Sequence, residues 1–166
     1  MFNDPYNQFF TTSGLYTPSV FSILLNHEVA RSKRYPSPLS ILQFSTCQPA
    51  PLSEEIRETI EKMVAQVLKT KLRQTDISSQ SKDGYLVLFT NTDGTGANIA
   101  TNRLLENFLV PILNNQNKPV EVGFCAGLVS HPGGPQVSAD HLLKQATFVH
   151  QEARTKGAGA LVFASL

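Results

Sequence analysis

The order of the helical and strand-like apolar segments is the feature that most constrains the fold of this chain of 166 residues. Apolar side chains recur at helical spacing in some segments and form short apolar or alternating runs in others. These segments follow one another in the order α β α β β α β α β, which combines one hairpin with helical crossovers. The order predicts an α+β fold in which helices flank a central, mostly antiparallel sheet, in a palm or ferredoxin-like arrangement.

Capping residues and prolines set the bounds of the predicted elements. Ser53 and Ser138 are typical N-caps, Pro18 fits the first turn of a helix, and Pro111 should end one. The predicted helices are residues 18–34, 54–71, 99–109 and 139–156. The predicted strands are residues 39–44, 76–79, 85–89, 120–129 and 161–163. Residues 91–96 and 130–135 are expected to be loops, and the last strand closes the domain.

A tight turn is predicted between the two strands at the centre of the chain. The run Ser81-Lys82-Asp83-Gly84 separates them, and Asp-Gly is typical of a two-residue turn whose residues both adopt positive φ. We therefore expect Asp83 and Gly84 to form the turn of a β-hairpin.

Composition excludes several classes of function. The chain has 14 Lys and Arg against 13 Asp and Glu, a net charge of +1, which argues against a sequence-blind nucleic-acid binder. No apolar run approaches the roughly 18 residues of a membrane span, so no membrane partner is expected. Cys47 and Cys125 are too far apart in sequence to indicate a disulfide framework or a zinc site, and a cytoplasmic location fits them. No cofactor and no metal are predicted.

Two parts of the chain are distinguished. Residues 1–12 are rich in aromatic side chains and Asn and have no clear period, so we interpret them as an arm that docks on this domain, on a partner or on a second copy. Residues 13–166 form the predicted domain.

Other polar residues are expected to play structural parts. The four histidines, His27, His131, His141 and His150, are predicted to be surface or half-buried, and no base is placed by sequence beside Ser45 or Cys47. Lys82 and the charged cluster of the second helix are predicted to be solvated; this cluster comprises Glu54, Glu55, Arg57, Glu58, Glu61 and Lys62.

Several separated segments resemble one family, the GGDEF or diguanylate cyclase domains. The likeness covers about residues 12–165 and rests on the register of these segments and not on one motif. They are Gly14–Phe21, His27–Arg31, Pro38–Leu42, Arg73–Asp76, Tyr85–Asp93, Val122–Ala126, Ser138–Lys144 and Ala153–Gly157. The resemblance implies the nucleotide-cyclase form of the predicted α+β fold.

The resemblance also implies a chemistry that can be compared with this sequence. Cyclases of the family condense two GTP molecules into cyclic di-GMP, and carboxylates at the end of the first strand and in the hairpin turn hold two metal ions. Here the two first-strand positions are Ser45 and Cys47, which are poor ligands for Mg²⁺. The run that reads guanine in the family is replaced by the shorter residues 48–53.

The family's pentapeptide becomes Ser81-Lys82-Asp83-Gly84-Tyr85 in this chain. Asp83 keeps the acid of the third position, and Arg154 keeps the charge of the family's phosphate-binding Lys. A following Arg of the family falls on Ala158. We therefore expect a remnant of a nucleotide site at Asp83 and Arg154, with no catalytic residues and no cyclase activity.

Three functions remain open. The first is an inactive GGDEF-like domain with a regulatory role in bacterial signalling through a protein partner or self-association; a charged fraction of 16% and the aromatic arm fit such contacts. The second is a sensor of cyclic di-GMP or a guanine nucleotide, because Arg73, Asp76 and Arg103 match the family's inhibitory site. The simpler interpretation is that Arg73 and Asp76 are an ordinary helix end and strand start. The third and weakest is a residual cyclase that uses Asp83 and Arg154.

Overall fold

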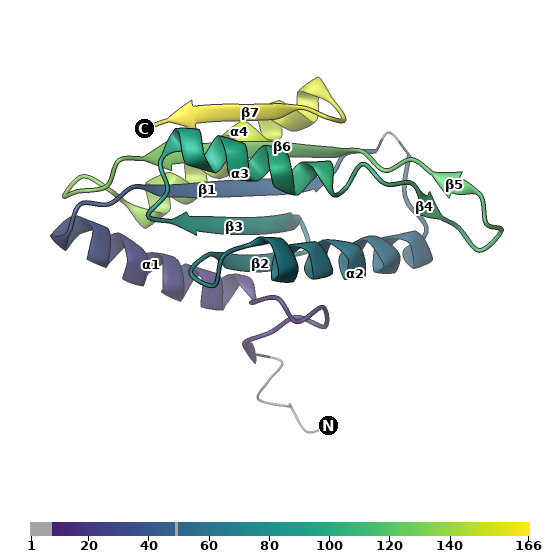
Figure 1. Ribbon diagram of the computed structural model, residues 1–166, viewed down its shortest axis with the longest axis horizontal. Helices are drawn as coiled ribbons and strands as arrows, with labels where there is room; N and C mark the ends of the chain where they lie inside the picture. Colours follow the sequence, from purple (N-terminus) through teal and green to yellow (C-terminus); the bar gives the residue numbers. More distant parts are fainter. Residues whose placement is uncertain (1–7, 49) are drawn as a thin grey trace.

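A computed structural model describes residues 8–48 and 50–166 of the chain. Its central feature is a five-stranded sheet in the order β2-β3-β1-β6-β7, antiparallel except where β6 and β7 run parallel (Figure 1). These strands are β1 (Leu39–Thr46), β2 (Ile77–Ser81), β3 (Gly84–Thr90), β6 (Phe124–His131) and β7 (Leu161–Ser165). The predicted α+β fold with a mostly antiparallel sheet is confirmed.

Four helices cover the two faces of this sheet. They are α1 (Pro18–Arg34), α2 (Glu54–Lys71), α3 (Gly94–Glu106) and α4 (Ala139–Lys156). Helices α2 and α3 pack on one face, and α1 and α4 pack on the other (Figure 1). In the described part of the chain, no helix is both long and apolar enough to cross a membrane.

Strand β1 lies at the centre of the sheet and supplies both cores. Leu42 and Phe44 pack with α2 and α3, whereas Leu39 and Ile41 pack with α1 and α4. Because both faces of β1 are covered, its apolar residues are distributed over both faces and do not alternate strictly with polar ones.

The bounds predicted for α3 were wrong. The helix begins at Gly94, inside the expected loop, because the Asp93 side chain accepts a hydrogen bond of 2.8 Å from the Gly96 N–H and caps it. The helix ends at Glu106, and Phe108 then lies in the core outside it. Two glycines in the first turn, which are poor helix formers, concealed this start from the apolar pattern.

The hairpin forms where it was predicted, but its turn residues differ. Ser81 pairs with Gly84, so Lys82 and Asp83 occupy the turn, and neither has a positive φ. Gly84 begins β3 with φ 132°, and a Cβ there would lie 2.4 Å from the Phe44 carbonyl oxygen. The glycine is needed because β3 passes so close to the backbone of β1.

The strand predicted over residues 120–129 is two separate elements. A short hairpin of β4 (Ile112–Leu113) and β5 (Pro119–Val120) extends from one end of the molecule, and β6 begins only at Phe124. Strands of two residues are too short to show a period, so the sequence pattern merged β5 with β6.

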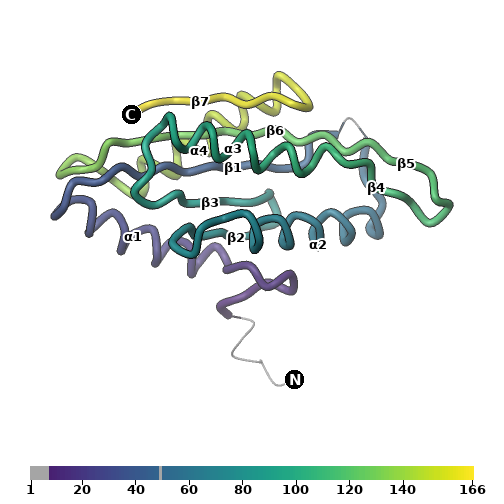
Figure 2. Tube along the Cα trace, viewed as in Figure 1, coloured from purple at the N-terminus to yellow at the C-terminus, as the bar shows by residue number. Residues whose placement is uncertain are grey.

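The segment before α1 covers the edge of β2 (Figure 2). The Tyr16 N–H donates to the Ser78 carbonyl over 3.3 Å, and the Tyr16 carbonyl accepts from the Gln80 N–H over 3.2 Å. Phe10 stacks on Tyr16 at a centroid distance of 5.2 Å. Of the predicted arm, residues 8–12 therefore lie beside the domain, and residues 1–7 are outside the described residues.

Candidate functional site

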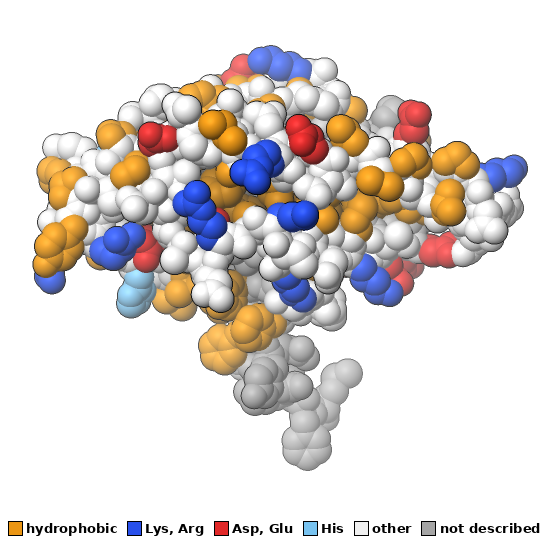
Figure 3. Space-filling view, viewed as in Figure 1, with side chains coloured by type: hydrophobic (Ala, Val, Ile, Leu, Met, Phe, Trp, Pro, Cys, Tyr) orange, Lys and Arg blue, Asp and Glu red, His pale blue; other side chains and the backbone are white. Residues whose placement is uncertain are grey.

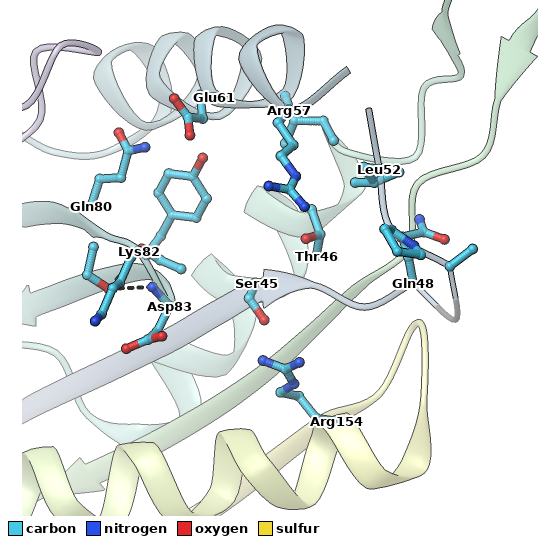
Figure 4. Close-up of a pocket in the computed structure, with 16 residues that line it drawn as sticks. Ser45, Thr46, Gln48, Leu52, Arg57, Glu61, Gln80, Lys82, Asp83 and Arg154 are labelled. Atoms are coloured by element: carbon cyan, nitrogen blue, oxygen red, sulfur yellow. Dashed lines mark hydrogen bonds between the residues drawn. The ribbon is translucent and has the colours of Figure 1, made fainter. Parts of the chain in front are cut away.

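A pocket of about 560 Å³ lies between the end of β1, the β2–β3 turn, the first half of α2 and the end of α4. Its charged side chains come from three elements: Arg57 and Glu61 from α2, Lys82 and Asp83 from the turn, and Arg154 from α4 (Figure 4). Three cations face two anions, so the pocket carries a net positive charge. The two predicted remnants of a nucleotide site, Asp83 and Arg154, line the same pocket.

Two guanidinium groups flank the end of β1. Figure 4 shows Arg57 reaching down from α2 and Arg154 reaching up from α4, with Ser45 and Thr46 between them. Arg57 is exposed, as predicted, and it also lines the pocket. It follows Ile56 of the buried stripe of α2, and this position at the border of the stripe is the signal that could have placed it in the pocket.

The Ser45 side chain forms a hydrogen bond with a histidine of α4. Its hydroxyl lies 2.9 Å from His150 Nε2, and the His150 residue is only 3% exposed. Burial, together with the nearby Arg154 charge, lowers the pKa of His150, so the ring is neutral at physiological pH. The expectation that His150 is a surface or half-buried residue was wrong, because α4 packs this face of its helix onto β1 and β6.

The carboxylates of the pocket are separated. Asp83 lies in the turn, where its backbone N–H donates to the Ser81 hydroxyl over 3.2 Å, and Glu61 lies across the pocket beside Gln80 (Figure 4). Tyr85 also lines the pocket; burial raises the pKa of its hydroxyl, and the Glu61 charge adds to this effect.

These donors do not fit a pair of magnesium ions. Mg²⁺ requires near-octahedral oxygen ligands, and the two-metal arrangement needs carboxylates close together. The end of β1 offers a hydroxyl at Ser45 and a thiol at Cys47. Among the described residues, no group of three or more His, Cys, Asp or Glu side chains is placed to hold a metal ion.

A second pocket, of about 450 Å³, lies near the start of β2 and the end of β3. It is lined by two arginines, Arg31 of α1 and Arg73, together with Glu28, Thr75, Thr90 and Asn91. Arg31 is also paired with Glu28 at 2.7 Å. Arg73, which was predicted as a binding residue, therefore lines a cavity. Arg31 lines the same cavity but was not predicted, because it belongs to a helix far away in sequence.

The other two residues predicted for this site do not line the second pocket. The Asp76 carboxylate accepts a hydrogen bond of 3.0 Å from the Arg73 N–H and so closes the turn between α2 and β2. Burial raises the pKa of Asp76, against hydrogen bonds from the Arg73 and Thr90 N–H groups that lower it. Arg103 is exposed on α3.

Several solved structures of GGDEF domains have the same fold. The GGDEF domain of DgcB from Caulobacter crescentus, in complex with c-di-GMP, superposes with a TM-score of 0.85 at 9% identity, over 98% of this chain and 98% of that one. The FimX GGDEF domain from Pseudomonas aeruginosa gives 0.78 at 14% identity, over 93% and 98%.

Diguanylate cyclase SiaD from Pseudomonas aeruginosa, in complex with its activator SiaC, gives a TM-score of 0.78 at 16% identity. The match covers 97% of this chain and 61% of that one. No protein-family model and no curated protein matches the sequence. The order of the sheet, the helices on its two faces and these superpositions agree, and the chain has the fold of a GGDEF domain.

Proposed function

We propose that this chain is a non-catalytic GGDEF-fold domain that regulates bacterial signalling through contact with another protein chain. The observation that carries the proposal is the set of side chains at the end of β1 and in the β2–β3 turn. The first offers Ser45 and Cys47, and the turn offers one carboxylate, Asp83, beside the cation Lys82.

The charge of the pocket supports the absence of catalysis. Cyclisation of GTP requires neutralisation of a triphosphate and of the charge that develops at the α-phosphate. Arg57, Lys82 and Arg154 can attract phosphates, but they cannot replace ions that bridge the attacking and leaving oxygens. Binding of a nucleotide here would therefore proceed without turnover.

Exposed apolar side chains support a role in protein contact. Leu109, Val110 and Leu113, between the end of α3 and the β4–β5 turn, are 81%, 63% and 58% exposed. Figure 3 shows orange side chains gathered over this end of the molecule. Contiguous apolar side chains on a surface are typical of a protein-interaction site.

Incubation of the protein with GTP and Mg²⁺ or Mn²⁺ is expected to yield no cyclic di-GMP. Losing the metal-binding carboxylates should reduce the rate by far more than the 10³-fold that corresponds to about 4 kcal/mol. The measurement is chromatography of the nucleotides after extended incubation, with an active diguanylate cyclase in the same buffer as the positive control.

Metal-dependent formation of cyclic di-GMP above a no-protein blank would overturn the proposal and favour a residual cyclase. The variant Asp83→Asn then separates the protein's own activity from a contaminant. A product that persists unchanged in this variant does not come from the pocket.

A second candidate function is recognition of cyclic di-GMP without catalysis. The specific observation is that Arg31 and Arg73 line one cavity. A guanidinium can bind guanine N7 and O6, or a phosphate, through two parallel hydrogen bonds. The proximity of two such groups suits a dianionic ligand that carries two guanine bases.

Titration calorimetry with cyclic di-GMP tests this candidate. If it is correct, the wild-type protein binds at micromolar ligand and Arg73→Ala weakens binding roughly tenfold to a hundredfold, the value of a lost charge-assisted hydrogen bond. Lys71→Ala is the matched control, since it removes a cation two residues away that does not line the pocket. Absence of heat with the wild type, or equal weakening by both variants, would exclude the site.

A further inference from the structure

We propose that Cys47 and Cys125 form a peroxide-sensitive site, at which oxidation joins β1 to β6 by a disulfide bond. The proposal concerns the side of the sheet that faces α4, next to the wall of the first pocket. It is independent of cyclase activity and of nucleotide binding.

The strand register brings the two cysteines together. Ser45 of β1 lies opposite Cys125 of β6, and the Cys47 N–H donates to the Gly123 carbonyl over 2.8 Å. Cys47 and Cys125 are therefore diagonal neighbours on adjacent strands. The residue directly opposite Cys47 is Gly123, which places no side chain between the two thiols.

Both thiols lie on the face that α4 covers. The Cys47 thiol lies 3.9 Å from the Arg154 carbonyl, and the Ser45 hydroxyl, on the same face, contacts His150. Cys125 is 1% exposed. Burial raises the pKa of Cys125 to about 12, and the neighbouring Cys47 thiol is the next cause of this rise.

The geometry requires only a small movement. Diagonal neighbours in an antiparallel pair have Cα atoms about 7–8 Å apart, and disulfides span about 4.4–6.8 Å, so a shift on the order of 1 Å is enough. Cys47 follows the last residue of β1, Thr46, and so lies just outside the strand. This end of the strand can therefore approach β6 without disturbing the ladder behind it.

The chemistry proceeds in two balanced steps with hydrogen peroxide as the oxidant. Cys47 is half-exposed and reacts first: its sulfur takes one oxygen of the peroxide, which gives a sulfenic acid and one water. The Cys125 sulfur then displaces the sulfenic oxygen, which leaves as a second water with the Cys125 proton. In sum, two thiols and one peroxide become one disulfide and two waters.

Oxidation would also fix one wall of the first pocket. Ser45, Thr46 and Gln48 line that pocket, and Cys47 lies among them in sequence. A bond from Cys47 to β6 would hold this end of β1 in place. Oxidation of the two cysteines would then restrict the pocket wall at the end of β1, although the disulfide itself would not touch a ligand in the pocket.

The test is oxidation of the reduced full chain with a small excess of hydrogen peroxide, followed by denaturation, alkylation and intact mass measurement. We expect the mass to fall by two hydrogen atoms, with no alkyl group added, and to return on treatment with dithiothreitol. Digestion without reductant should give one linked peptide pair that contains Cys47 and Cys125.

The variant Cys47→Ser changes a side chain at the strand end and leaves the buried Cys125 in place. It should show no loss of mass, and its Cys125 should remain fully alkylated after denaturation. Stable oxygen adducts on Cys47 of the wild type, with Cys125 still alkylated, would overturn the proposal. Disulfide-linked dimers in place of the internal bond would overturn it equally.

Discussion

Replacement of Phe44 by alanine is expected to lower the free energy of unfolding by about 3–5 kcal/mol. Phe44 is fully buried at the end of β1 and stacks on Tyr85 and Phe108, with centroid distances of 5.1 and 5.6 Å. Phe124 packs against it at 6.2 Å. Removal of the ring leaves a cavity lined by side chains of β3, of β6 and of the segment that follows α3, so it cannot close by movement of one side chain.

Urea denaturation followed by circular dichroism measures this effect, and Phe163→Ala is the matched control. Phe163 lies on the edge strand β7 and is 45% exposed, so its removal should change stability by about 0.5 kcal/mol. Equal losses for the two variants would contradict the view that the aromatic cluster around Phe44 holds the sheet to α3. Such a result would also call into question the position of the pocket wall at Ser45, the next residue.

The bounds of a helix were predicted correctly where its N-cap residue and its apolar stripe were both clear in the sequence. Ser53 and Ser138 cap α2 and α4 as expected, by accepting hydrogen bonds of 3.4 Å from the Ile56 and His141 N–H groups. The bounds of these helices were correct because the caps stand immediately before strong apolar stripes. The start of α3 was missed because Asp93 is followed by two glycines, whose propensity opposes the helix that the cap begins.

Residue patterns alone predicted the candidate sites only where the residues are close in sequence; the family resemblance is what joined Asp83 and Arg154 in one expected site, and both line the first pocket. Asp83 was placed in the hairpin, and Arg73 beside a turn, from short segments. The contact of Ser45 with His150 joins residues 105 positions apart, and it depends on the packing of α4 on β1 and β6. Likewise, only the strand register makes Cys47 and Cys125 diagonal neighbours. A sequence pattern indicates which face of a helix or strand is buried, but it does not indicate which distant element packs on that face.

Helix α4 carries His150 and Arg154, and its distance from the sheet is set by one residue of β6. A Cβ on Gly127 would lie 2.3 Å from the His150 backbone nitrogen and 2.7 Å from its Cα. Contacts this short against backbone cannot be relieved by a side-chain rotation. Gly127→Ala must therefore push α4 away from the sheet, and we expect it to lower the free energy of unfolding by about 1–3 kcal/mol or more.

The control for Gly127→Ala is Gly94→Ala in the first turn of α3. A Cβ at Gly94 would lie 2.7 Å from the end of the Phe163 ring, which is partly exposed and can rotate away, and alanine favours the helix. Gly94→Ala should therefore leave stability within about 0.5 kcal/mol of the wild type. If Gly127→Ala is tolerated as well as this control in urea denaturation, then α4 does not rest on β6 at Gly127. In that case the contact between Ser45 and His150 would lose its support, because the same helix position determines it.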